Sequence, residues 1–350
     1  MVDAKIAKKH KVEKKGIVLL GIGIVVLFLI VKLVGASRIV PVLLGMDYRY
    51  LGLIVGFQAL VILTWNLRWN FIVNKLKRSS FFRLMPIFMS GLLVNNLTPG
   101  PSIGGEPVTA YYLSKETKKS FSECLATVVM DMAVHTIGFL VFAAFAILYV
   151  FLFIQVRMIQ VLLGILILVI SVLAIISYVL IKKSKSKGVS SKFESLLKWI
   201  YKIRFLEKIM KRFKKYEELR KHMLEQIKRF KETVTELMKF KRLLIGTFVL
   251  ALMLHVFEFL KVYTAFLSLG QSVPIVYIIV VTSIASTLGY FIFLPGGTGV
   301  VEAAMIAMYF ELGIPLGVAA TATLISRAVF YLSTYGVGYA SLSYLNLKYK

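Results

Sequence analysis

Several kinds of residue are scarce in this chain of 350 residues. It has a single cysteine, Cys124, which excludes an internal disulfide and a cysteine-based metal cluster. Acidic residues number 17 against 43 Lys and Arg, and there are four His. No grouping of Asp and His has the spacing of metal ligands, and no motif assembles a nucleophile, a base and a metal. The sequence therefore predicts a protein that is not an enzyme and that holds no cofactor and no metal.

Apolar residues are abundant and are arranged in long runs. They make up 58% of the chain, and several charge-poor runs approach the roughly 20 residues that a helix needs to cross a bilayer. The first run, Ile17 to Val34, is longer than the apolar core of a signal peptide and does not end in a small-residue cleavage site. The fold class that follows is an all-α polytopic integral membrane protein with a retained first span.

The net charge of +26 is concentrated in two segments. Residues 1–15 carry a net +4 and residues 182–242 a net +14, and both segments flank apolar runs. Lys and Arg beside membrane spans mark the cytoplasmic side and attract anionic headgroups. This distribution predicts anionic membrane lipids as partners and argues against nucleic acid. A homo-oligomer stays open.

One unusual motif occurs twice. A Pro-Gly turn is followed seven residues later by a glutamate, Glu106 in one copy and Glu302 in the other, and the two copies are 196 positions apart. The predicted turn residues are Pro99, Gly100, Gly104, Gly105, Pro295, Gly296, Gly297 and Gly299. Hydrocarbon cannot hydrogen-bond the freed backbone groups, so such a break must be buried in protein or line a polar cavity. The two breaks predict one site built from both.

The Lys and Arg asymmetry predicts opposite orientations for the two motifs. The segment 84–113 has basic residues at both ends, and its arms of roughly 13 and 7 residues, about 20 and 10 Å, are too short to span. The segment 275–310 ends without Lys or Arg, as an outside loop does. We therefore expect an inverted repeat of span, re-entrant hairpin, span, with six full spans and two hairpins. The alternative is eight ordinary membrane helices.

These patterns divide the chain into four regions. The division is a basic cytoplasmic N-terminus (1–16), a first membrane half (17–181), a basic amphipathic cytoplasmic insert (182–242) and a second membrane half (243–345). Both termini are expected in the cytoplasm, and the location is the plasma membrane. The insert has an apolar stripe at steps of three or four residues, which fits docking on the membrane surface, packing on the protein itself, or binding a partner.

The paired motifs carry a family resemblance. Pro99-Gly-x-x-x-Gly-Gly-Glu106, Leu294-Pro-Gly-Gly-x-Gly-x-x-Glu302, and the later Arg327 and Tyr331 resemble the transmembrane region of the lysylphosphatidylglycerol synthase/flippase family. The resemblance covers residues 15–345 and implies the lipid-translocating part of such proteins. The soluble aminoacyl-transfer domain of full-length members has no counterpart in this sequence, so we expect a stand-alone member.

The candidate substrate-binding or coupling residues are ionisable groups inside the predicted membrane segments, with one tyrosine: Arg327, Glu302, Glu106, Asp131 and Tyr331. Arg327 and Asp131 lie near the expected midplane, where an unpaired charge costs at least about 2.5 kcal/mol. They pair with each other, or Arg327 holds a lipid phosphate that Asp131 or Glu302 releases. Glu106 and Glu302 start the returning arms, where each is a helix cap or a proton-coupling group.

Three functions fit this set of features. The first is a flippase-like translocase for an anionic lipid or a polyprenyl-phosphate-linked lipid. The second is an ion-coupled small-solute secondary transporter, which uses the same architecture. The third is a non-catalytic or accessory component of lipid modification.

The predicted orientation is testable by cysteine labelling. In a Cys124→Ala background, single cysteines at Ser114 and Lys119 should react with an impermeant maleimide only from the cytoplasmic side, and one at Gly313 only from outside. Inside-out and right-side-out vesicles give the two measurements. Labelling of position 313 from the cytoplasm would remove the inverted arrangement.

Overall fold

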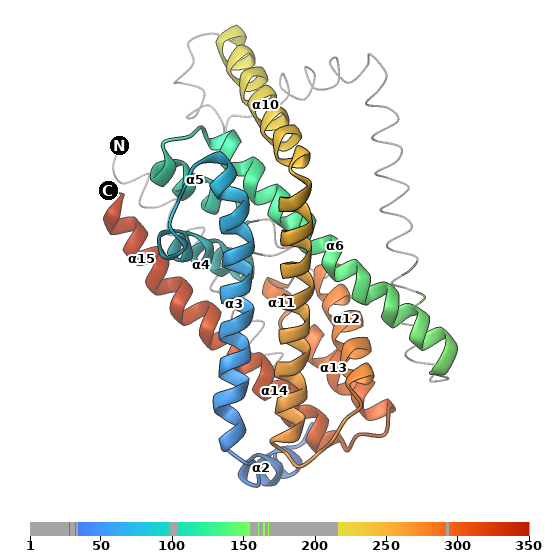
Figure 1. The fold of residues 1–350 in the computed structure, drawn as a ribbon. Helices are drawn as coiled ribbons and strands as arrows, with labels where there is room; N and C mark the ends of the chain where they lie inside the picture. Colours follow the sequence, from blue (N-terminus) through green and yellow to red (C-terminus); the bar gives the residue numbers. More distant parts are fainter. Residues whose placement is uncertain are drawn as a thin grey trace.

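A computed structural model describes residues 34–98, 104–154, 216–291 and 294–349, together with Phe28, Lys32, Gln160, Gly164 and Ile167. The regular elements in these ranges are all helices (Figure 1). They are α2 (Ala36–Leu44), α3 (Arg49–Leu76), α4 (Phe81–Leu97), α5 (Glu106–Thr117), α6 (Phe121–Phe153), α10 (Tyr216–Lys239), α11 (Lys241–Leu267), α12 (Ile275–Phe291), the 3-10 turn η1 (Pro295–Gly297), α13 (Val300–Glu311), α14 (Leu316–Leu332), the π-helical turn η2 (Ser333–Val337) and α15 (Gly338–Lys348).

Four stretches of the described helices are long and apolar enough to cross a membrane. They are α3, α6, α11 and the continuous run Leu316–Lys348 formed by α14, η2 and α15. The predicted all-α membrane protein is thereby confirmed. The predicted first span, 17–34, lies almost wholly outside the described residues. The short helix α2 was not predicted.

The basic residues gather at one end of the helical bundle. Lys77 Nζ donates to Thr117 O at 2.9 Å, which joins the end of α3 to the end of α5. Lys348 Nζ donates to Glu116 Oε2 at 2.9 Å, which adds the end of α15. We call this the basic end. At the opposite end, Asp47 N donates to Ser268 O at 2.8 Å and so joins the start of α3 to the end of α11.

Two pairs of short helices lie inside this frame, and they open toward opposite ends of the bundle. The first helical pair, α4 and α5, begins after α3 and finishes before α6, so both of its ends lie at the basic end. The second helical pair, α12 and α13 with η1 between them, begins after α11 and finishes before α14 at the opposite end (Figure 1).

The inner tips of the two pairs meet. A Cβ built on Gly296 of η1 would lie 2.7 Å from Oδ1 of Asn96, near the end of α4. Each pair is also surrounded by its own apolar core: Trp69, Leu84 and Leu113 belong to the core of the first pair, and Phe266 and Tyr309 to the core of the second. The end of α4, which precedes the first Pro-Gly motif, therefore lies against the η1 turn of the second.

Glycines allow the turn in the second helical pair. Gly296, Gly297 and Gly299 have φ values of 60°, 65° and 89°, a region in which residues with a Cβ are strained. Residues Pro295–Gly297 form the 3-10 turn η1. In the first pair Pro99 and Gly100 lie outside the described residues, and Gly104 and Gly105 directly precede α5.

The described part of the basic insert is α10, which continues α11 beyond the basic end (Figure 1). It packs against α6, where Ser122 Oγ contacts Gln226 Oε1, and Leu237 of the predicted apolar stripe is buried. Over residues 216–239 the insert therefore packs on the protein itself. Residues 182–215 lie outside the described ranges.

The close approach of α4 and the start of α5 requires a residue without a side chain at position 105, and this requirement can be tested. A Cβ there would lie 2.0 Å from the backbone oxygen of Gly91, so Gly105→Ala should force the two helices apart and lower stability by about 1–3 kcal/mol. Thermal unfolding in detergent, followed by the fluorescence of Trp65 and Trp69, measures the loss. Gly56→Ala in α3 is the matched control, because a Cβ at Gly56 meets nothing within 4 Å. Equal melting temperatures for the two variants would contradict the close crossing.

Candidate functional site

The turn of the second helical pair places a carboxylate in the protein interior. Glu302 lies in the first turn of α13 and is fully buried. Its Oε2 accepts a hydrogen bond from Gly299 N at 2.5 Å, which satisfies one of the free N–H groups at the start of the helix. The Oε2 atom therefore caps the helix, which is one of the two predicted roles of Glu302. The other oxygen, Oε1, faces α14.

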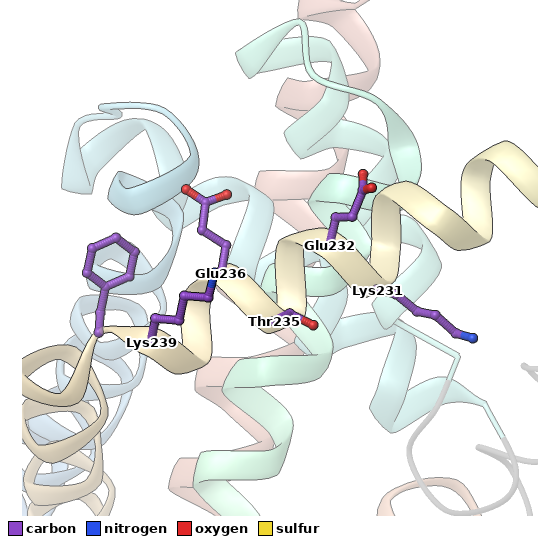
Figure 2. A pocket seen from close by; sticks show the side chains of 6 residues that line it. Lys231, Glu232, Thr235, Glu236 and Lys239 are labelled. Atoms are coloured by element: carbon purple, nitrogen blue, oxygen red, sulfur yellow. The ribbon is translucent and has the colours of Figure 1, made fainter. Parts of the chain in front are cut away.

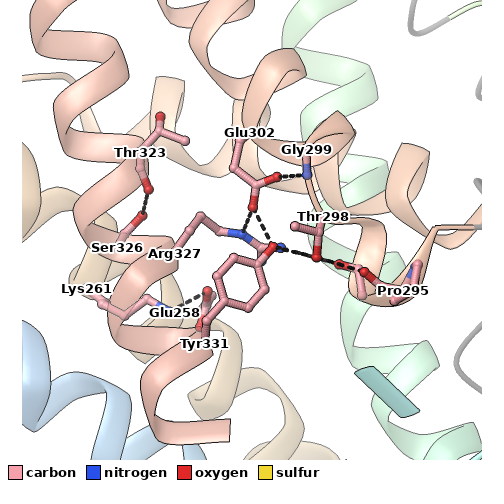
Figure 3. A network of polar contacts seen from close by, with 11 residues as sticks. Glu258, Lys261, Pro295, Thr298, Gly299, Glu302, Thr323, Ser326, Arg327 and Tyr331 are labelled. Atoms are coloured by element: carbon pink, nitrogen blue, oxygen red, sulfur yellow. Dashed lines mark hydrogen bonds and ion pairs between the residues drawn. The ribbon is translucent and has the colours of Figure 1, made fainter. Parts of the chain in front are cut away.

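Arg327 of α14 binds that second oxygen (Figure 3). Its Nε donates to Glu302 Oε1 at 2.6 Å, and its Nη2 donates to Tyr331 OH at 2.8 Å and to Gly296 O at 3.4 Å. Tyr331 OH also lies 2.7 Å from Glu302 Oε1 and 3.1 Å from Thr298 Oγ1. We call these residues the Arg327 site. It brings together three of the five predicted candidates, Arg327, Glu302 and Tyr331, and ties them to the η1 turn.

Aromatic rings line the other side of the guanidinium. The Arg327 Cζ atom lies 5.0 Å from the ring centre of Phe330 and 4.9 Å from that of Tyr331, within the range of cation–π attraction. Tyr331 stacks on Tyr335, which is part of the π-helical turn η2, with ring centres 5.8 Å apart. Such π turns recur at functional sites. Sequence reasoning named Tyr331 but missed the π turn beneath it.

A second ion pair flanks the Arg327 site. Lys261 Nζ on α11 donates to Glu258 Oε1 at 2.7 Å and to Gln58 Oε1 on α3 at 2.8 Å, and it lies 5.8 Å from the ring centre of Phe330. Glu258 and Lys261 therefore neutralise each other. Both cations lie near the ring of Phe330, and each is paired with a carboxylate. The two positive and two negative charges of these pairs therefore sum to zero.

Asp131 does not pair with Arg327, and that predicted alternative is wrong. Its carboxylate accepts from Arg68 Nε at 2.7 Å and Arg68 Nη2 at 2.9 Å, and from Trp65 Nε1 at 3.1 Å. Helices α3 and α6 pack together and bring this bidentate partner closer than α14. Sequence reasoning missed Arg68. A signal was available, because Arg68 lies inside the long apolar run 51–73 and a charge within the membrane needs a partner.

A histidine pair extends this second charged cluster toward α11. His135 Nδ1 lies 3.4 Å from Arg68 Nη1, and the His135 ring stacks on Trp65 and on His255, with ring centres 4.6 and 5.0 Å apart. Both histidines lie among aromatic side chains in the interior. Within the described ranges no group of three or more His, Cys, Asp and Glu is arranged to hold a metal ion.

The carboxyl of Glu106 has fewer hydrogen-bond partners among the described residues than that of Glu302. It begins α5 and is buried, and its Oε1 accepts from Asn95 Nδ2 at 3.1 Å. Its Oε2 is buried without a hydrogen-bond partner among the described residues. The two motifs thus match in sequence but differ in the charges around their glutamates.

One pocket in the described residues lies on α10. Its lining residues are Lys231, Glu232, Thr235, Glu236, Lys239 and Phe240 (Figure 2). It lies beyond the basic end and contains none of the candidate residues. The chemistry of the site therefore rests with the buried charges of the bundle.

The Arg327 site has one feature suited to an anionic ligand. The Arg327 side chain is 16% exposed whereas Glu302 is 0% exposed, and Nη1 has no hydrogen-bond partner within the described part of the chain. A guanidinium presents five N–H donors in a planar fork that matches phosphate and carboxylate oxygens. An anion that reaches Arg327 therefore finds free donors without Glu302 having to leave first.

The Arg68–Asp131 pair predicts a stability defect. Asp131→Asn leaves the fully buried Arg68 side chain without a counter-charge, which typically costs about 3–5 kcal/mol. Thermal unfolding in detergent should show a large drop in melting temperature. The control is Glu311→Gln at the exposed end of α13, which should leave the melting temperature unchanged. A melting temperature for Asp131→Asn equal to that of the control would contradict the ion pair.

Comparison with known proteins agrees with the resemblance read from the paired motifs. A UPF0104 membrane protein of Methanocaldococcus jannaschii is 30% identical over 338 residues, which cover 95% of this chain and 96% of the relative. A UPF0104 membrane protein of Pyrococcus horikoshii is 28% identical over 325 residues, or 91% of this chain and 94% of the relative.

A third relative, from Methanothermobacter thermautotrophicus, is 25% identical over 335 residues, which cover 95% of this chain and 96% of the relative. The family model described as the lysylphosphatidylglycerol synthase TM region matches residues 16–338. This chain therefore belongs to the family of the lysylphosphatidylglycerol synthase transmembrane region.

Proposed function

We propose that this protein is a flippase-like translocase for an anionic lipid or a polyprenyl-phosphate-linked lipid, acting without an enzymatic step. The observation that carries the proposal is Arg327, whose side chain is partly exposed and whose guanidinium is held among a carboxylate, a tyrosine hydroxyl and the η1 turn inside a membrane-protein fold. Family membership supports it, because the family is related to lipid flippases. The location in this proposal is the plasma membrane, with both termini in the cytoplasm.

An inverted repeat with two re-entrant hairpins is part of the proposal. The opposite openings of the two helical pairs support it, as does the contact between Asn96 and Gly296 at their tips. In transporters of this kind, exchanging the conformations of two equivalent halves switches access from one side of the membrane to the other. The Arg327 site, beside the tips, is then reached from either side in turn.

Partner exchange at Arg327 is the proposed binding step. A lipid phosphate binds Nη1 and Nη2 of Arg327 and replaces Tyr331 OH and Gly296 O as the acceptors of Nη2. Glu302 either keeps its hydrogen bond from Arg327 Nε or keeps only the one from Gly299 N. Arg327 keeps an anionic partner throughout, so its own buried charge is never left uncompensated, which is the costly state. When the lipid leaves, Glu302 and Tyr331 restore the neutral site.

Arg327→Lys tests the geometry of this contact. Lysine retains the positive charge but loses the planar fork, so translocation of a fluorescent phosphatidylglycerol in proteoliposomes should fall at least about tenfold, which corresponds to about 1.4 kcal/mol. An impermeant quencher measures the lipid that reaches the outer leaflet. Arg242→Lys at the exposed start of α11 is the matched control and should translocate like the wild type.

A purely structural role for Arg327 makes a different prediction. If the guanidinium only neutralises Glu302, the double variant Glu302→Gln with Arg327→Gln removes both charges together and should recover both melting temperature and translocation. Recovery of translocation in that double variant would refute phosphate binding at Arg327. Recovery of stability with translocation still lost would support it.

A further inference from the structure

The two glutamates of the repeated motif differ in one decisive respect. Glu302 is hydrogen-bonded through both oxygens, and one of these bonds comes from the cation Arg327. Glu106 occupies the same position in its motif, seven residues after the Pro-Gly turn, yet it forms no ion pair among the described residues. A carboxylate locked to a guanidinium cannot easily exchange a proton, whereas a buried carboxyl without a counter-charge is free to do so.

The immediate contacts of Glu106 are all neutral. Its relative exposure is 9%, and the Asn95 side chain donates a hydrogen bond from Nδ2 to its Oε1. Asn95 is itself fixed, because its Oδ1 accepts from Gly105 N at 2.5 Å. The remaining oxygen, Oε2, is buried and has no partner within the described ranges. Neutral donors of this kind serve a protonated carboxyl as well as an ionised one.

The charged groups on the helices packed against α5 are all engaged elsewhere. On α4 the described ionisable residue is Arg83, which pairs with Glu116 at the far end of α5. On α6, Glu123 binds Ser120, and Asp131 binds Arg68, with His135 beside that arginine. On α15, Lys348 binds Glu116.

The other ionisable groups near α5 are also at a distance from Glu106. Lys115 and Glu116 of α5 itself lie nine and ten residues further along, or about 14 Å along the axis. Tyr112 OH donates to Asn346 Oδ1, and Cys124 contacts Thr117. The segment 99–103, which leads into α5, has the sequence Pro-Gly-Pro-Ser-Ile and contains no ionisable side chain.

We propose that Glu106 is the proton-binding site that couples lipid movement to a pH difference across the membrane. This inference rests on the proposed translocase function. A proton from water on one side forms an O–H bond on Oε2, and the same bond releases it to water on the other side, with no change of oxidation state and no other reactant. The protonated, neutral carboxyl suits the buried position that Glu106 has in this structure. The ionised carboxylate favours a conformation in which water reaches the tip of the first helical pair, because an uncompensated charge is costly away from water.

Transport in proteoliposomes gives the first test. Wild-type translocation of fluorescent phosphatidylglycerol should change with an imposed pH gradient. Glu106→Gln, which imitates the protonated acid, should keep translocating but lose that dependence. Glu311→Gln, an exposed carboxyl at the end of α13, is the matched control and should keep it. A pH dependence in Glu106→Gln equal to that of the wild type would overturn the proposal, and so would a wild type that responds to a sodium gradient and not to pH.

Infrared titration of the purified protein tests proton binding without transport. The wild type should show a carboxyl C=O band that disappears on raising the pH, and this band should be missing in Glu106→Gln and present in Glu311→Gln. If the wild type is inert in liposomes, the translocase proposal fails, and the infrared band alone decides whether Glu106 binds a proton. Persistence of the band in Glu106→Gln overturns the assignment.

A second variant covers a folding failure of Glu106→Gln. Asn95→Ala keeps Glu106 but removes the hydrogen bond from the Asn95 amide to its carboxyl. The midpoint of the infrared band should move in Asn95→Ala relative to the wild type. An unchanged midpoint would mean that the titrating carboxyl lies elsewhere in the chain.

Discussion

Every charge inside the helical bundle must be neutralised within it, and the arrangement of the site depends on this requirement. Arg68 binds Asp131, Lys261 binds Glu258, and Arg327 binds Glu302. Each of these three pairs brings a cation to a carboxylate in the interior, and two of them join different helices. An isolated buried charge costs several kcal/mol, so these pairs largely determine how α3, α6, α11, α13 and α14 can pack. Glu106 differs from these carboxylates because it forms no ion pair among the described residues.

Much of the fold could be predicted from local properties of the sequence. Apolar run length predicts α3, α6 and α11 to within about three residues at either end, because a span reflects composition alone. The glycine-rich turn and the Glu258–Lys261 pair could also be predicted, since both depend on residues close together in the chain. Helix α2 and the π turn η2 could not, because each depends on packing against distant helices rather than on its own residues.

The partner of Asp131 marks the limit of reasoning from a repeat. The constant spacing between the two motifs places Asp131 opposite Arg327, and their opposite charges made a direct pair attractive. The charges around the two motifs differ, however. Arg327 on α14 binds the glutamate of the second motif, Glu302. The matching position in the first half of the chain is Asp131, and it binds Arg68 on α3. The choice of partner depends on the three-dimensional approach of helices that are far apart in the sequence.

The continuity of α10 and α11 has a mechanical consequence. The two helices form one rod interrupted only at Phe240, whose backbone is non-helical at φ −83° and ψ 78°. Lys75 lies 4.6 Å from the Phe240 ring centre and holds this joint against α3. Lys261 lies 21 residues along α11, about 30 Å from the joint, and touches the ring that backs Arg327. Because α10 packs against α6 while α11 packs against α3 and α6, the helix that carries Lys261 is anchored at the basic end on both sides of the joint.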